Sequence, residues 1–174
     1  MLNKLNLGCG GDYKKGWVNL DCNSNIKSVP DIVYNLNNIP WKPFKNNQFD
    51  EIFASHIIEH FPNPLEIFEE LYRISKNGGV IKIKVPHWSH YFAFTDMTHK
   101  TFFSINSFRL LDSNLKYYDR KFKFKLKFVK YNNSLGFLRK IINKILNLNP
   151  ILTENILCRM IPIKEIVAEL IVIK

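Results

Sequence analysis

Residues 5–10 read Leu-Asn-Leu-Gly-Cys-Gly, and residues 17–21 read Trp-Val-Asn-Leu-Asp. Each stretch is apolar, too short for a helix, and closed by a glycine turn or an aspartate, which is typical of a strand and the loop after it. A strand ending in a glycine turn, followed by a strand ending in a carboxylate, is how open α/β sheets hold a ribose-bearing ligand. The two stretches therefore predict an α/β fold with a ligand site at Gly8, Gly10 and Asp21.

The length and residues of the segment between the two stretches indicate which class of ligand this site binds. Residues 12–16, Asp-Tyr-Lys-Lys-Gly, amount to about one helical turn, which is much less than the crossover helix of a standard βαβ unit. A dinucleotide site would have glycine in place of Tyr13 and a full helix with its amino end at the pyrophosphate. The sequence therefore favours a ribose-bearing cofactor that is not a dinucleotide.

The rest of the chain alternates predicted strands and helices. The clearest helix follows Asn63, with Pro64 as its first residue and Glu66 in the capping-box position, and is expected to end at Asn77-Gly78. The other expected strands are residues 31–34, 49–54, 80–85, 121–128 and 166–173, and the other expected helices are residues 135–146 and 152–160. This alternation predicts one α/β domain over residues 1–174, with a helical insertion at about residues 133–162 before the last strand.

Composition and charge leave the partner open. A hydrophobic content of 46% excludes a disordered chain, and the formal net charge of +10 favours polyanions. Lysines alternate with apolar residues over residues 121–128, a pattern that either protects an exposed edge strand or contacts phosphates. Three cysteines without paired spacing predict neither a disulfide framework nor a zinc knuckle. With no leader and no apolar run long enough to span a bilayer, we expect a cytoplasmic protein without a transmembrane segment.

Five segments together resemble the successive motifs of class I S-adenosylmethionine-dependent methyltransferases. They are residues 5–10 (LNLGCG), 17–21 (WVNLD), 49–52 (FDEI), 55–61 (SHIIEHF) and 70–79 (ELYRISKNGG). Their order and spacing agree over residues 4–86, and the combination is far more specific than any one segment. The resemblance implies a Rossmann-like, open, mostly parallel sheet of about seven strands, with an antiparallel last strand and helices on the faces. It also implies that the cofactor is S-adenosylmethionine.

The resemblance assigns the cofactor-binding residues position by position. They are Asn6, Gly8, Cys9, Gly10, Asp21, Asn35, Leu36, Ser55 and His56. Asp21 would hold the ribose hydroxyls, and Asn35-Leu36 stands where the family reads the adenine edge. Asn6 replaces the acid that often begins the glycine motif of the family.

The loop after the strand at residues 80–85 carries groups suited to a methyl acceptor. It lies beyond the carboxyl end of its strand, where the cleft of an open α/β sheet is found. His90 and His99 are the candidate catalytic residues, because histidine titrates near neutral pH and can take a proton. His87, Tyr91 and Asp96 are the candidate substrate residues.

The expected activity is methyl transfer to an oxygen or nitrogen of a small-molecule, glycan or lipid-linked acceptor. The basic, apolar-faced helix at residues 135–146 is compatible with a lid, a peripheral membrane contact or core packing. Nucleic acid is a less favoured partner, and the sequence does not indicate the oligomeric state.

Two other functions remain open from the residues alone. A basic binding module could keep this fold without catalysis and bind RNA or an anionic surface. Residues 56–60, His-Ile-Ile-Glu-His, match the H-x-x-E-H zinc hydrolase signature, in which His56 and His60 would bind the metal beside Glu59. Residues 61–64, Phe-Pro-Asn-Pro, would end such a helix at once, so we predict no metal ligands.

Overall fold

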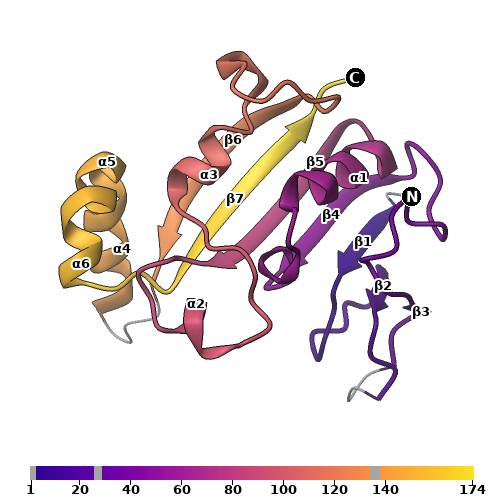
Figure 1. The fold of residues 1–174 in the computed structure, drawn as a ribbon, viewed down its shortest axis with the longest axis horizontal. Helices are drawn as coiled ribbons and strands as arrows, with labels where there is room; N and C mark the ends of the chain where they lie inside the picture. Colours follow the sequence, from indigo (N-terminus) through magenta and orange to yellow (C-terminus); the bar gives the residue numbers. More distant parts are fainter. Residues whose placement is uncertain (1–2, 26–28, 134–137) are drawn as a thin grey trace.

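The protein is an open β-sheet with helices packed against it (Figure 1), and the computed structural model describes residues 3–25, 29–133 and 138–174. The strands are β1 (Lys4–Leu7), β2 (Val18–Asp21), β3 (Ile32–Val33), β4 (Phe49–Ser55), β5 (Ser75–Pro86), β6 (Phe124–Asn132) and β7 (Glu165–Val172). The α-helices are α1 (Pro64–Ile74), α2 (Phe92–Thr95), α3 (Ile105–Arg109), α4 (Arg139–Leu148), α5 (Pro150–Leu152) and α6 (Cys158–Met160). The 3-10 turns are η1 (Ile58–His60) and η2 (Ser113–Leu115), and a π-helical turn, η4 (Thr153–Leu157), joins α5 to α6.

Strand direction brings several loops to one edge of the sheet. The strand order is β3-β2-β1-β4-β5-β7-β6, with β1 to β5 pairing in parallel and β7 antiparallel to both β5 and β6. The predicted open, mostly parallel sheet with an antiparallel last strand is confirmed. Because parallel strands end at the same edge, the loops after β1, β2, β3, β4 and β5 meet there.

The two faces of the sheet differ in chemistry. Ile52 of β4 and Ile83 of β5 are fully buried, and Figure 1 shows α1 and α3 on one face of the sheet. The alternate residues are charged and paired: Glu51 lies 2.9 Å from Lys4 and 2.6 Å from Lys82. This alternation is that of a sheet with one dry and one wet face.

Helix α1 begins where the sequence predicts but ends earlier. Asn63 does not cap the backbone; its Nδ2 donates to Glu66 Oε1 at 2.8 Å. The helix stops at Ile74 and not at Asn77-Gly78, because Ser75 is already extended and its hydroxyl donates to the carbonyl of Leu71 at 2.7 Å. Strand β5 therefore starts at Ser75, five residues before the predicted strand at 80–85.

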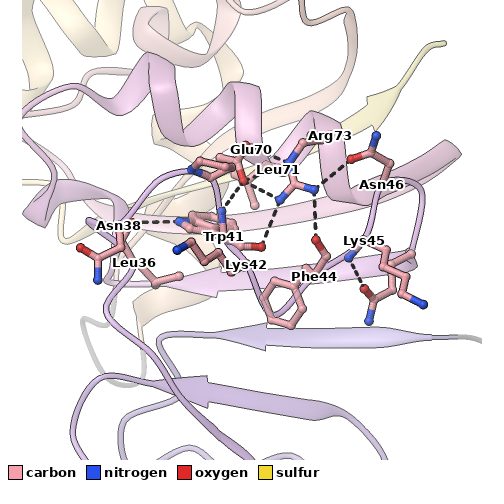
Figure 2. A network of polar contacts seen from close by, with 12 residues as sticks. Leu36, Asn38, Trp41, Lys42, Phe44, Lys45, Asn46, Glu70, Leu71 and Arg73 are labelled. Atoms are coloured by element: carbon pink, nitrogen blue, oxygen red, sulfur yellow. Dashed lines mark hydrogen bonds and ion pairs between the residues drawn. The ribbon is translucent and has the colours of Figure 1, made fainter.

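A polar network fastens the connector after β3 to α1 (Figure 2). Glu70 of α1 accepts the backbone N–H of Trp41 at 2.9 Å and is paired with Arg73 at 2.7 Å. Arg73 donates in turn to the carbonyls of Trp41 (3.2 Å) and Phe44 (3.1 Å). The indole of Trp41, fully buried, donates to the carbonyl of Leu36 at 2.9 Å. The network thereby places Leu36 beside the end of β3.

Helix α4 packs against β6 with apolar and polar residues together: Leu146 is buried and Ile142 is packed in a cluster with Tyr131. Asn147 accepts the N–H of Tyr131 and donates to its carbonyl, both at 2.9 Å, and Asn143 accepts the N–H of Asn133 at 2.7 Å. The edge strand β6 has free backbone groups, and these amides satisfy them. Ile141 and Ile145 are exposed. The predicted start of this helix at Leu135 lies outside the described residues.

Strand β6 is the edge strand that its lysines indicate. It begins at Phe124 and ends at Asn132, later than the predicted strand at 121–128, with a register shift between Leu126 and Phe128. Within the described part of the chain, no helix combines the length and the apolar character needed to cross a bilayer.

Candidate active site

The turn after β1 is shaped by two glycines with positive φ. Gly8 has φ +63° and Gly10 has φ +48°, a region in which residues with a Cβ are strained. A Cβ on Gly8 would lie 2.7 Å from Cγ1 of Ile57, whereas a Cβ on Gly10 would meet nothing within 4 Å. Gly8 is therefore required by space as well as by conformation.

Asp21 closes this turn from the end of β2. Its Oδ2 accepts the N–H of Gly10 at 2.8 Å, and its Oδ1 accepts the N–H of Asn23 at 3.0 Å. Each oxygen keeps a second lone pair, so the carboxylate can still accept hydrogen bonds from a ligand.

A cavity of about 280 Å³ opens between the loops after β1, β2, β3 and β4. It is lined by Gly8, Asp21, Cys22, Asn35, Leu36, Asn37, Ile57, His60 and Phe61. Gly8, Asp21, Asn35 and Leu36 were assigned to the cofactor from the sequence, and the structure brings them together around one space. The carboxylate of Asp21 and the amide of Asn35 are its polar groups on two neighbouring strand ends.

Asn6 and Cys9 lie beneath the turn and not on the cavity wall. Asn6 is buried, and its Nδ2 donates to the carbonyl of Asp12 at 2.7 Å and to Asn19 Oδ1 at 3.0 Å. Cys9 is buried too, its N–H donates to the carbonyl of Leu20 at 2.9 Å, and burial raises the pKa of its thiol. Both residues hold the shape of the turn.

A second, open cleft of about 560 Å³ adjoins the loop after β5. It is lined by His56, Pro86, Phe92, Thr95, Asp96, Met97, Thr98 and His99. The structure thus places two of the predicted acceptor residues, Asp96 and His99, with His56 on the same cleft. Hydrogen bonds from Thr98 hold the pKa of the Asp96 carboxyl below its ordinary value.

His56 projects into this cleft from a strained backbone position. It directly follows β4 and has φ +53°, a left-handed conformation that is rare for histidine. Its Nε2 lies 3.2 Å from Glu165 Oε2, and its Nδ1 lies 3.4 Å from Glu59 Oε1. Interaction with Glu165 and then with Glu59 raises the pKa of His56 to about 9.

Hydrogen bonds join the segment after β4 to the loop that carries His99. The carbonyl of Glu59 accepts the N–H groups of Lys100 (2.8 Å) and Thr101 (3.1 Å), and the hydroxyl of Thr101 donates to the carbonyl of Phe61 at 2.8 Å. These bonds bring the rings of His60 and His99 to 4.8 Å between centroids, edge to face. His60 lines the cavity and His99 lines the cleft, so the two spaces meet at this pair.

The other predicted site residues lie outside both spaces. His87 is fully buried, and its ring contacts Ser89 Oγ at 2.9 Å and Glu154 Oε2 at 3.3 Å. His90 stacks on the exposed ring of Tyr91, and burial, with Lys164 nearby, lowers the pKa of His90. Ser55, the last residue of β4, is partly buried and lines neither space.

Sequence reasoning did not assign five residues that line the cavity. They are Cys22, Asn37, Ile57, His60 and Phe61. Cys22 and Asn37 come one residue after assigned positions, so adjacency alone was the available signal. His60 was noticed only as part of the H-x-x-E-H pattern, and no pattern pointed to Glu165, which reaches His56 from the last strand.

The comparisons with known proteins agree with this arrangement. A family model described as a methyltransferase domain matches residues 9–83. A search of curated protein sequences gave no match. A chain in the complex of the Haloferax volcanii Trm112 methyltransferase activator with a methyltransferase is similar, with a TM-score of 0.66 and 16% identity over 99% of this chain and 83% of that chain.

Two further solved structures share the fold. An S-adenosylmethionine-dependent methyltransferase from Archaeoglobus fulgidus has a TM-score of 0.58 and 18% identity, over 98% of this chain and 86% of that chain. The plantazolicin methyltransferase BpumL in complex with S-adenosylhomocysteine has a TM-score of 0.55 and 17% identity, over 99% of this chain and 76% of that chain.

The family-model match and the fold together give the class of the protein. Residues 9–83 match the methyltransferase-domain model, and the chain has the fold of S-adenosylmethionine-dependent methyltransferases. It is a methyltransferase, and S-adenosylmethionine is its cofactor. The cavity fits that molecule in one respect: the carboxylate of Asp21 lies on its wall and keeps lone pairs that can accept from the ribose hydroxyls.

Proposed function

We propose that the cavity at Gly8 and Asp21 binds S-adenosylmethionine and that a methyl group passes to an oxygen or nitrogen of an acceptor in the cleft at His99. The observation that carries this proposal is the junction of the two spaces. Ile57 and His60 line the cavity, while His56, in the same loop, lines the cleft. A methyl donor on one side and an acceptor on the other would thus meet across one short segment.

The residues around the cavity have distinct tasks in this proposal. Asp21 would accept hydrogen bonds from the ribose hydroxyls. Asn35 Oδ1 already accepts from the backbone N–H and from Nδ2 of Asn37, both at 3.0 Å, and would accept from the adenine amino group in place of the Asn37 side chain. Leu36, placed by the network on Trp41, would contact the base. When bound, the cofactor supplies a methyl group on a positively charged sulfur, which is already an activated leaving group.

Positioning does most of the catalytic work in such a site. The acceptor's lone pair would form the bond to the methyl carbon while the electron pair of the broken carbon–sulfur bond stays on sulfur, and the acceptor's proton would pass to Nε2 of His99. We assign His99 as the residue that contacts the acceptor atom, because it lines the cleft and its Nε2 faces Glu59. His90 lines no part of the cleft and is the weaker of the two candidates.

Among small-molecule, glycan and lipid-linked acceptors, the surface favours the lipid-linked class. Phe92 and Met97 on the cleft are exposed. The helical insertion adds an outward apolar surface of Ile141, Ile145, Leu148, Ile151, Ile156 and Met160, with Arg139, Lys140, Lys144 and Arg159 also exposed. Apolar residues flanked by cations complement the headgroups and acyl chains of an anionic membrane, so we propose that this surface rests on one.

The protein is proposed to act as one domain, in the cytoplasm. Cys9, Cys22 and Cys158 are free thiols, which suits a reducing compartment. The deciding experiment incubates the protein with methyl-labelled S-adenosylmethionine and a cell extract separated into lipid and aqueous fractions. Label in the lipid fraction, lost with Asp21→Ala, is expected. Label confined to the aqueous fraction would overturn the lipid-linked acceptor, and no transfer to either fraction would contradict the proposed site.

A further inference from the structure

We propose that Glu59, His60 and His99 form a binding site for a divalent first-row transition-metal ion. One possible ligand atom from each of the three lies within 4.8 Å of the others. The three residues come from the two loops that separate the cofactor cavity from the acceptor cleft. The site stands on this geometry, and its use toward the acceptor rests on the function proposed above.

Glu59 is the group that most requires a cation. Its side chain is 1% exposed, and neither carboxylate oxygen has a hydrogen-bond partner among the described residues. The neighbouring nitrogens are His56 Nδ1 at 3.4 Å, on an imidazolium that Glu59 shares with Glu165, and His99 Nε2 at 4.0 Å. Neither contact has hydrogen-bond geometry. Burial of a carboxylate without such bonds is costly, and an ion held between Glu59 and the two imidazoles would remove that cost.

The two imidazoles are already oriented as metal ligands are. Nδ1 of His99 lies 3.0 Å from the carbonyl of Ala93, which can only accept, so Nδ1 carries the proton. Nδ1 of His60 lies 2.9 Å from Thr98 Oγ1, whose own proton goes to Asp96 Oδ1 at 2.6 Å, so this Nδ1 donates as well. Each Nε2 is left with a free lone pair. Metal-binding histidines have this pattern, with the second nitrogen bonded to a carbonyl or a polar group.

The proposed ligand set therefore differs from the one that the H-x-x-E-H spacing suggested, in which His56 and His60 would bind the metal. Only Ile58–His60 forms a helical turn, η1, so residues 56–60 do not form the single helix of a metallopeptidase. The second imidazole comes from His99, brought to Glu59 by the bonds of Lys100 and Thr101 to the Glu59 carbonyl. His56 stands outside the set and contacts Glu165.

The donor set selects the kind of ion. Two imidazoles and one carboxylate suit Mn²⁺, Fe²⁺, Co²⁺ or Zn²⁺ better than Mg²⁺ or Ca²⁺, which prefer oxygen ligands. Ligands on one tetrahedral ion stand about 3.4 Å apart, so the present spacing must close by about 1 Å. Three protein ligands leave at least one position for an outside group. On the cleft side, that position would hold the oxygen of a hydroxyl acceptor beside the donor methyl. The ion would lower the pKa of this hydroxyl, and in the metal-bound protein it would replace Nε2 of His99 as the contact to the acceptor atom.

The test measures cation binding apart from methyl transfer. Tag-free protein is stripped with a chelator and titrated with Co²⁺, which is read by its visible absorption, and with Mn²⁺ and Zn²⁺ by calorimetry. One ion per chain is expected, with a cobalt spectrum free of thiolate charge transfer. Glu59→Gln and His99→Gln should each weaken binding by at least roughly tenfold. His90→Gln, a histidine of the same loop outside the set, should leave the affinity unchanged.

The outcomes separate this site from the methyltransferase function. Glu59→Gln keeps the shape of the side chain and removes the buried charge, so a folded variant is expected, with unchanged affinity for S-adenosylmethionine. Absence of binding at millimolar metal, or equal affinity in Glu59→Gln, His99→Gln and the unaltered protein, would overturn the metal site and leave the cofactor site standing. If the unaltered protein did not bind S-adenosylmethionine, that result would instead contradict the proposed function.

Discussion

The backbone N–H of Gly10 donates a hydrogen bond of 2.8 Å to Oδ2 of Asp21, and this bond ties the turn after β1 to the end of β2. The carboxylate thus serves the fold and the proposed ribose contact at once. Substitutions of Asp21 must therefore be read for stability as well as for affinity.

Replacing Asp21 with alanine should weaken S-adenosylmethionine binding roughly 10- to 100-fold, because hydrogen bonds to a charged group contribute about 1.5–3 kcal/mol. Asp21→Asn keeps an acceptor for Gly10 and should retain more of the stability. Calorimetry gives the affinity, and circular dichroism verifies the fold. Asp119→Ala, at an exposed aspartate of another loop, is the control. Unaltered affinity in Asp21→Ala would remove Asp21 from the cofactor site.

The two glycines of the turn should respond differently to alanine. At both positions the positive φ costs about 1–2 kcal/mol for a residue with a Cβ. Gly8→Ala adds a contact of 2.7 Å with Ile57, so it should lower the free energy of unfolding further than Gly10→Ala does. Urea denaturation of both variants provides the comparison. Adding Ile57→Ala should recover part of the loss in Gly8→Ala only, and equal recovery in both backgrounds would disprove the steric argument.

Removing the cation of the Glu70–Arg73 pair should loosen the connector. Arg73→Met leaves the buried Glu70 carboxylate without its 2.7 Å partner and frees the carbonyls of Trp41 and Phe44. We expect a loss of about 3 kcal/mol in the free energy of unfolding, since breaking a buried pair strands a charge. Arg73→Lys should recover only part of it, because lysine lacks the planar fork. The proposed contact of Leu36 with adenine should weaken in parallel, and a variant of undiminished stability would argue against the network.

Acid should destabilise the insertion through Glu154. Burial acts to raise the pKa of this carboxyl, but hydrogen bonds from His87, Trp88 and Tyr131 prevail and lower it to about 2, from an ordinary value of 4.5. Because the folded value is depressed, the stabilisation is complete above pH 4.5 and is lost as the pH falls toward 2. It amounts to roughly 3 kcal/mol. Unfolding free energies measured from pH 6 to pH 2.5 should fall less steeply for Glu154→Gln, and parallel curves would refute the assignment.

The outward face of α4 should govern vesicle binding. Ile141→Ser with Ile145→Ser removes exposed apolar side chains that pack against nothing buried, so the fold should persist while binding to phosphatidylserine-containing vesicles drops about tenfold. Binding of the unaltered protein should weaken with salt. Sedimentation with vesicles is the measurement, and Val33→Ser, at an exposed residue of β3, is the control. Equal sedimentation of all three proteins would exclude this surface.

The sequence predicted the parallel half of the fold well because its signals are local. The strands at Lys4–Leu7 and Phe49–Ser55 and the start of α1 at Pro64 follow from short apolar runs and a proline. The predicted end of α1 was wrong because Ser75 is already extended, with its hydroxyl bonded to the carbonyl of Leu71. No sequence pattern indicates this bond. The apolar pattern of α4 did not decide which of its residues face the sheet: Leu146 is buried, Asn147 pairs with the edge strand, and Ile141 is exposed.

Sequence reasoning grouped residues that follow or end adjacent strands and missed contacts between distant segments. Gly8 follows β1 and Asp21 ends β2, so spacing alone predicted that they lie together. The set of Glu59, His60 and His99 depends on backbone bonds between two loops, and the partner of His56, Glu165, comes from the last strand. Contacts between residues so far apart in the sequence depend on the order of strands in the sheet, which could not be predicted from this sequence alone.

Glu70 and Arg73 hold the connector between β3 and β4 only if both side chains lie on the same side of α1. The two residues lie three positions apart on one side of α1, so both reach residues 41–46 only while the helix keeps its register. One residue inserted between them would turn Arg73 by about 100° around the helix axis, away from the connector. Length changes inside α1 should therefore be rejected, and the wall of the cavity at Leu36 would report the register of this helix.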